Sequence, residues 1–144
     1  MSAVRRPARA RPAAPAPRRE ASAGSAAILE RLRAICLALP EAREKLSHGE
    51  PTWFAGGGKV FAMFDDHHHG ARHVSVWLPA PPGAQSVLIA NDPERFFRPP
   101  YLGHRGWVGV VLDGRPRWPF VAELVEQAYR LVAAPRLVAR LDER

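Results

Sequence analysis

Apolar residues recur at helical spacing near both ends of the chain. Ser25 is suited to cap a first helix and Pro40 to end it. The buried face between them is predicted to consist of Ile28, Leu29, Leu32, Ile35, Cys36 and Leu39. Near the C-terminus the same spacing predicts a helix that begins at Pro119 and a shorter one after Pro135. Their apolar positions are Phe120, Val121, Leu124, Val125, Ala128, Leu131 and Val132, followed by Leu137, Val138 and Leu141.

The middle of the chain instead shows short β-rich runs. Four strands are predicted, at residues 52–54, 59–64, 73–78 and 106–112, and a glycine turn joins the first two. Residues 41–50 are polar and predict either an edge strand or a loosely structured approach to the sheet. Residues 84–90 predict a short helix, after which Asn91-Asp92-Pro93 is expected to cap a further helical turn through Phe97. This order predicts an α+β two-layer sandwich, an antiparallel sheet with the N- and C-terminal helices packed on one face.

Charge is distributed unevenly along the 144 residues. The basic tail (residues 1–24) carries six arginines against one acid, and its Arg/Ala/Pro composition predicts disorder. Residues 25–144 form the predicted domain and hold 15 basic and 13 acidic side chains, a net charge of only +2. No run is long and apolar enough to span a bilayer. The single cysteine, Cys36, cannot form an internal disulfide, so a reducing, cytoplasmic compartment is expected.

Residues 95–113, RFFRPPYLGHRGWVGVVLD, are the stretch around which we expect the rest to be organised. Pro99 and Pro100 fix the backbone and remove two donors, so the chain before the last strand is predicted to be a rigid, irregular loop. That loop carries aromatic and basic side chains to a sheet edge. A binding site is therefore expected there.

Five segments of the chain, in their order and spacing, resemble the MmcQ/YjbR family. They are Leu39-Pro40, Gly58-Lys59-Val60-Phe61-Ala62, Pro100-Tyr101-Leu102, Gly106-Trp107-Val108 and residues 123–132, ELVEQAYRLV. The resemblance covers roughly residues 28 to 141. It implies a frataxin-like (CyaY-like) α/β sandwich and a double-wing DNA-binding protein. It implies no shared catalytic residues that could be assigned to positions of this chain.

Two binding hypotheses follow from the residues and the resemblance. The first is a non-catalytic protein that contacts double-stranded DNA through phosphates, with Lys59, Arg98, Tyr101, His104, Arg105 and Trp107 as candidate contacts. For Tyr101 and Trp107, packing of the loop is the favoured interpretation. The second hypothesis is a protein- or small-ligand-binding module that uses the groove between the Pro99–Trp107 loop and the sheet.

Enzymatic chemistry has little support in the sequence. The histidines near residues 65–73 suggest a metal site, for which His67, His69 and His73 are the candidates. Adjacent histidines in a turn point in different directions, so a solvated turn is the favoured interpretation and no metal is expected. The Gly56-Gly57-Gly58-Lys59 segment lacks the phosphate-loop spacing, and Cys36 lies on a buried stripe away from any base. We expect no cofactor and no enzyme. The sequence does not indicate an oligomeric state.

Overall fold

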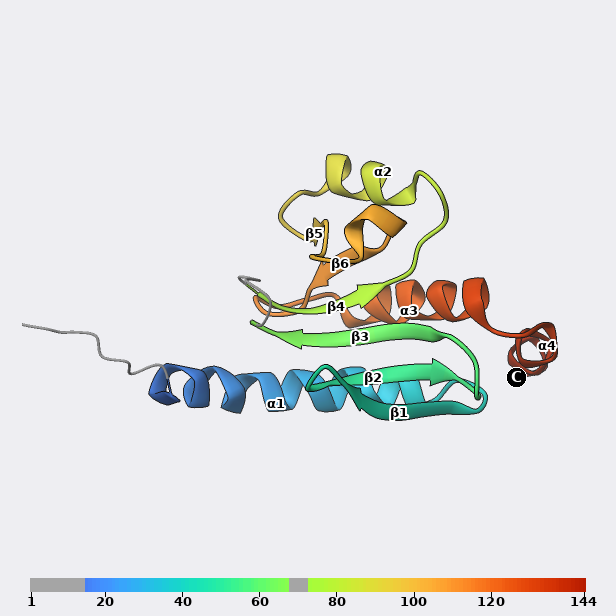
Figure 1. The fold of residues 1–144 in the computed structure, drawn as a ribbon, viewed down its shortest axis with the longest axis horizontal. Coiled ribbons are helices and arrows are strands. Elements are labelled where there is room, and N and C mark those ends of the chain that lie inside the picture. The colour runs from blue at the N-terminus through green and yellow to red at the C-terminus, as the bar shows by residue number, and fades with distance from the viewer. Residues whose placement is uncertain (1–14, 68–72) are drawn as a thin grey trace, which may run out of the picture.

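The computed structural model describes residues 15–67 and 73–144 and confirms the α+β fold class (Figure 1). Its elements are α1 (Pro15–Leu37), β1 (Ala42–Ser47), β2 (Glu50–Ala55), β3 (Val60–Asp66), β4 (Val74–Leu78), α2 (Ala84–Asn91), β5 (Phe96–Phe97), the 3-10 helix η2 (Gly103–Arg105), β6 (Val108–Val111), α3 (Trp118–Val132) and α4 (Pro135–Asp142). None of the helices in this described part of the chain is long and apolar enough to cross a membrane.

The six strands form one antiparallel sheet in the order β1-β2-β3-β4-β6-β5. The first four strands are sequential neighbours, whereas β6 lies between β4 and β5. The β1–β2 hairpin closes through His48 and Gly49, whose φ angles are 54° and 82°. Positive φ at both turn residues gives the backbone twist that two-residue hairpins require.

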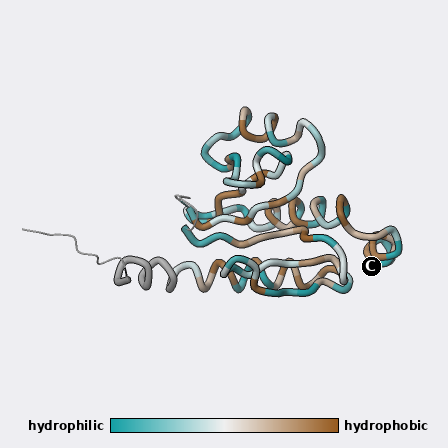
Figure 2. The backbone as a smooth tube through the Cα atoms, in the orientation of Figure 1, coloured by the Kyte–Doolittle hydropathy of each residue, from teal (hydrophilic) through white to brown (hydrophobic). Residues whose placement is uncertain are grey.

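The helices create the core by covering one face of the sheet. Leu32 and Cys36 of α1 and Val121, Val125 and Ala128 of α3 are buried together with the apolar residues of the central strands. Figure 2 shows the same division, with hydrophobic segments on β3 and on the helices behind it, and a hydrophilic β1 at the sheet edge. The amphipathic spacing at both ends of the chain thus predicted the core correctly.

Two local predictions differ from the structure. The first helix begins at Pro15, ahead of Ser25, which is buried within the helix instead of capping it. The alanines that precede Ser25 are strong helix formers, so no break occurs there. The part of the predicted disordered tail at residues 1–14 lies outside the described residues. Residues 41–50 contain the regular strand β1 at the sheet edge, which is the first of the two alternatives predicted for them.

The second difference lies after α2. Residues 92–97 form a turn followed by the short strand β5, and not a helical turn. Asp92 favours the turn because its side-chain Oδ1 accepts a hydrogen bond from the backbone N–H of Arg95, at 3.2 Å. The chain then pairs Phe96 with Val110 of β6. This arrangement brings β5 to the sheet edge and sends the following loop back across the uncovered face.

Candidate binding groove

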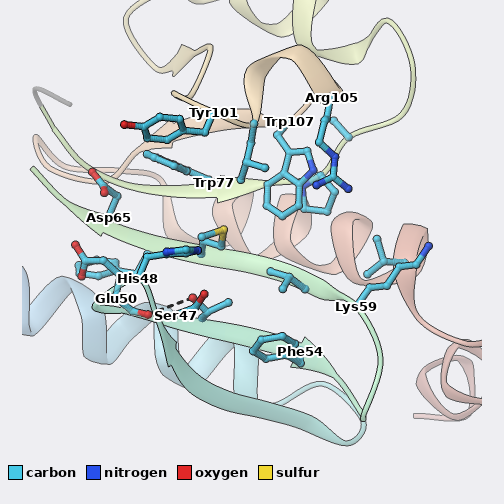
Figure 3. Close-up of a pocket in the computed structure, with 18 of the residues that line it drawn as sticks. Ser47, His48, Glu50, Phe54, Lys59, Asp65, Trp77, Tyr101, Arg105 and Trp107 are labelled. Atoms are coloured by element: carbon cyan, nitrogen blue, oxygen red, sulfur yellow. Dashed lines mark hydrogen bonds between the residues drawn. The ribbon is translucent and has the colours of Figure 1, made fainter. Parts of the chain in front are cut away.

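A groove of about 960 Å³ lies on the face of the sheet opposite α1 and α3, here called the open face, and also reaches Leu131 and Val132 at the end of α3 (Figure 3). Its floor is built from β2, β3 and β4, and one wall is the loop of residues 98–107. The lining residues are Ser47, His48, Glu50, Thr52, Phe54, Gly58, Lys59, Val60, Met63, Phe64, Asp65, Trp77, Pro79, Ala80, Tyr101, Leu102, Arg105, Trp107, Leu131 and Val132.

Strand register assembles the floor. Directly opposed residues of antiparallel strands point to the same face, and one such row runs from Thr52 to Met63 to Trp77 to Gly109. The indole N–H of Trp77 donates to the Ser75 hydroxyl at 3.0 Å. The Thr52 hydroxyl donates to a backbone carbonyl at 3.1 Å. Because these polar atoms are satisfied within the sheet, the floor presents mainly apolar and aromatic surface to the groove.

Gln85 of α2 holds the loop wall in place. Its amide nitrogen donates to the backbone carbonyls of Gly103, at 2.9 Å, and Trp107, while its oxygen accepts from Arg98 at 3.2 Å. The Arg98 side chain lies so close over Gly103 that a Cβ there would be 2.4 Å from its Cγ. Glycine is therefore required at this crossing unless the arginine moves.

Tyr101 occupies the rim of the same wall. Its φ angle of 66° is uncommon for a non-glycine residue and costs free energy that the surrounding loop must offset. The side chain is 72% exposed, in contrast to Trp107, which is 8% exposed. Trp107 thus fits the packing interpretation while still lining the groove, and Tyr101 does not.

The two ends of the groove differ in charge. Figure 3 shows Lys59 and Arg105 at one end, projecting from the start of β3 and from the loop. Glu50 and Asp65 lie at the other end beside His48. Glu50 also accepts the backbone N–H of Asp66 at 3.0 Å, which ties the β1–β2 hairpin to β3. Between the two ends, anionic groups are consequently favoured at the Lys59–Arg105 end.

The candidate contacts predicted from the sequence separate into two sets. Lys59, Tyr101, Arg105 and Trp107 come together around the groove. Arg98 and His104 are exposed on the loop but do not line the groove, and Arg98 is engaged with Gln85. Of the candidate cations, Lys59 and Arg105 are therefore the two that line the groove.

The histidine candidates do not form a metal site in the described residues. The Nδ1 atom of His67 lies 2.8 Å from a carboxylate oxygen of Asp66, and that of His73 lies 3.4 Å from Asp113. His69 lies outside the described residues. Within residues 15–67 and 73–144, no group of three or more histidine, cysteine or acidic side chains is placed to hold a metal ion.

Four arginines on the helix side, Arg33, Arg130, Arg136 and Arg140, are each ion-paired with an acidic side chain. Two others on that side make different contacts: Arg31 lies over the Trp118 ring, and Arg144 donates to the Ala38 carbonyl. The hydrogen bonds from Arg136 to Glu41 are the main cause of the lowered pKa of that carboxyl group. On the open face the exposed side chains of Arg43, Lys45, Lys59 and Arg105 form no ion pair with another residue of the described ranges. We call these four residues the rim cations.

Register places the first two rim cations beside the groove. Arg43 is directly opposed to Phe54, and Lys45 to Thr52, so both side chains share the open face. The ammonium nitrogen of Lys45 lies 5.1 Å from the centre of the Phe54 ring, within the range of a cation–π contact. The basic surface thus extends from the groove across β1.

The sequence alone did not identify the residues of the groove floor or the role of Gln85 in holding the loop wall. Phe54, Met63 and Trp77 fall in predicted strands, and alternation within each strand could have assigned them to one face. Which face stays uncovered depends on helix packing, which the strands themselves do not encode. Gln85 belongs to no recognisable sequence motif. Its role arises only where α2 and the loop lie side by side in the fold.

The family model for YjbR matches residues 37–131, well over half of the chain. The chain belongs to the YjbR family. All four rim cations lie within the matched segment. Among solved structures, the protein DR2400 of Deinococcus radiodurans, described as a DUF419 domain, is similar over 72% of this chain and 76% of its own, with a TM-score of 0.59 and 20% identity. At that identity the likeness supports the fold alone. No curated protein matches the sequence.

Proposed function

We propose that this YjbR-family chain is a non-catalytic protein that binds duplex DNA through the open face of its sheet. The observation that carries the proposal is the contrast between ion-paired arginines on the helix side and the rim cations on the open face. Cations that form no ion pair can neutralise phosphates without first breaking one.

The mode of contact follows from where the rim cations lie. Arg43 and Lys45 stand on the edge strand β1, and Arg105 stands on the loop across the groove. β1 and the loop thus form two ridges, one on each side of the groove, and each ridge can contact backbone phosphates. Tyr101 is exposed on the loop ridge and can pack against sugar or base edges. Such an interface is dominated by charge and carries little sequence preference.

The test is binding of a labelled duplex by the full-length chain across a salt series. Four phosphate contacts predict a log–log slope of about −3.6, from about 0.9 per phosphate. The Lys59→Gln/Arg105→Gln variant should weaken binding and reduce the magnitude of the slope by about 1.8. The matched control is Arg115→Gln/Arg117→Gln, because these exposed arginines lie in the connection before α3 and do not line the groove.

A further variant separates the domain from the part of the basic tail that precedes α1. Arg5, Arg6, Arg9 and Arg11 are replaced by glutamine in the full-length chain, which leaves α1 intact. If the domain is the binding unit, this variant still binds and still responds to Lys59→Gln/Arg105→Gln. Complete loss of binding in the tail variant, or equal losses in the groove and control pairs, would assign the affinity to general positive charge and reject the proposal.

A further inference from the structure

The groove has the size and the surface of a small-molecule site. Its volume of about 960 Å³ lies in the range of roughly 300–1,000 Å³ that pockets for small ligands occupy. Phe54, Met63 and Trp77 offer aromatic and thioether surface along its floor, and Trp107 closes one wall. A duplex resting on the two ridges would contact the rim of this hollow and leave its floor unused.

The wall of the groove is held before any ligand arrives. Gln85 fixes two carbonyls of the loop, and Gly106, with φ of 85°, lets the chain turn from η2 into β6. Pro99 and Pro100 restrict the segment leading into this turn. A preformed wall reduces the ordering cost of binding, which is a common property of small-ligand sites.

Charge at one end of the groove selects the ligand. Lys59 and Arg105 project from opposite sides of the same end, and neither forms an ion pair with another described residue. An anionic head placed there is attracted by both positive charges. At the same time an apolar body can extend over Met63 and Trp77 toward the middle of the floor.

We propose that the groove binds an amphiphilic organic anion, with its anionic head between Lys59 and Arg105 and its aromatic or aliphatic body on the floor formed by Phe54, Met63 and Trp77. This site shares Lys59 and Arg105 with the proposed DNA-binding surface, but its floor lies outside that surface and the proposal does not require DNA binding. Carboxylates and phosphate monoesters share the required chemistry, and competition distinguishes them.

The probe for the test is anilinonaphthalene sulfonate, an aromatic anion whose fluorescence rises in apolar surroundings. Its neutral analogue phenylnaphthylamine lacks the sulfonate and reports the contribution of the floor alone. The full-length native chain should bind the sulfonate at one site, about tenfold or more tightly than the neutral analogue, as expected when two charge-assisted contacts are added. Competition with dodecanoate and with phenyl phosphate then shows which head group is preferred.

Variants test the two ends of the proposed ligand separately. Lys59→Gln/Arg105→Gln should lower affinity for the sulfonate about tenfold and leave the neutral analogue unchanged. Phe54→Ala, at a half-buried position, should weaken both probes. The Arg115→Gln/Arg117→Gln control should affect neither. Thermal denaturation of each variant identifies any variant that is partly unfolded and binds the probe for that reason.

Three results would overturn the inference. The first is equal binding of charged and neutral probes by the native chain. The second is an equal loss of sulfonate affinity in the groove pair and the control pair. The third is no saturable binding of the sulfonate by a chain whose cooperative thermal transition shows it to be folded. Since none of these measurements involves DNA, they leave the proposed function to its own test.

Discussion

Glu44 offers the sharpest test of how the edge strand is held to the helix layer. Its Oε1 accepts hydrogen bonds from Arg33 Nε at 2.8 Å and from Trp53 Nε1 at 2.9 Å, and its Oε2 accepts from Arg33 Nη2 at 2.7 Å. The Trp53 side chain is fully buried. The single carboxylate therefore joins α1, β1 and β2.

Replacement of Glu44 by alanine should remove about 1.5–4 kcal/mol of unfolding free energy. A buried indole N–H without its acceptor costs about 1–3 kcal/mol. The ion pair adds only about 0.5–1 kcal/mol because Arg33 and Glu44 are 28% and 24% exposed and water screens them in part. Glu44→Gln retains an oxygen for Trp53 and should cost less, about 1 kcal/mol.

Urea unfolding followed by circular dichroism measures these differences without relying on Trp53 fluorescence. The control is Glu30→Ala, which removes the other acidic partner of Arg33 from a position that is 69% exposed. Its loss should be much smaller than that of Glu44→Ala. A loss below about 0.5 kcal/mol for Glu44→Ala, or equal losses for the two alanine variants, would refute the assignment of Glu44 as a structural acceptor.

Glu44 should also make the stability of the fold depend on pH. The hydrogen bonds from Arg33 are the main cause that lowers the pKa of Glu44 in the folded chain. A lowered folded pKa means that the ionised carboxylate stabilises the fold fully above the unfolded pKa of about 4.3, and that this stabilisation is lost as pH falls through the folded pKa. The stability gap between the native chain and Glu44→Gln should hence be constant near neutrality and shrink below about pH 4.

Three further predictions concern the core and the sheet. Tyr129→Phe removes the hydroxyl that donates to the Pro40 carbonyl at 2.6 Å, and should cost about 1–2 kcal/mol in urea unfolding; an unchanged midpoint would contradict this. Gly109→Ala places a Cβ 2.3 Å from the Phe97 ring and should lower stability by about 1–3 kcal/mol, whereas a variant as stable as the native chain would show that β5 can shift freely. The Cys36 thiol is fully buried, and burial raises its pKa, so Ellman's reagent should react with one thiol per chain in denaturant and not in the native chain.

The parts of the fold that were predictable are those in which local pattern and burial coincide. Leu32 and Cys36 in α1, and Val125 and Ala128 in α3, lie on helical stripes and are buried as expected. The β1–β2 hairpin was not predictable in the same way. Its strand β1 is polar because one side faces solvent and the other side presents Glu44 to Arg33, so no apolar alternation marks it.

The candidate site was predictable in its loop and not in its floor. Tyr101 and Arg105 stand out in sequence because aromatic and basic groups follow two prolines. Trp77 does not stand out, because its groove position depends on pairing with Met63 and Gly109 across the sheet. The pairing register between strands brings these residues into one row. The pattern within a single strand does not specify which strands pair with it or in what register.

Because Lys59 and Arg105 belong to both proposed surfaces, the two ligands should compete. An anion seated between them neutralises two of the four rim cations, so saturating anilinonaphthalene sulfonate should weaken duplex binding by about tenfold at low salt. Linkage requires that saturating duplex weaken sulfonate binding by the same factor. Fluorescence anisotropy of the labelled duplex measures one direction, and probe emission measures the other. Two unchanged affinities would mean that DNA contacts the β1 edge without Lys59 and Arg105, and would separate the DNA surface from the groove.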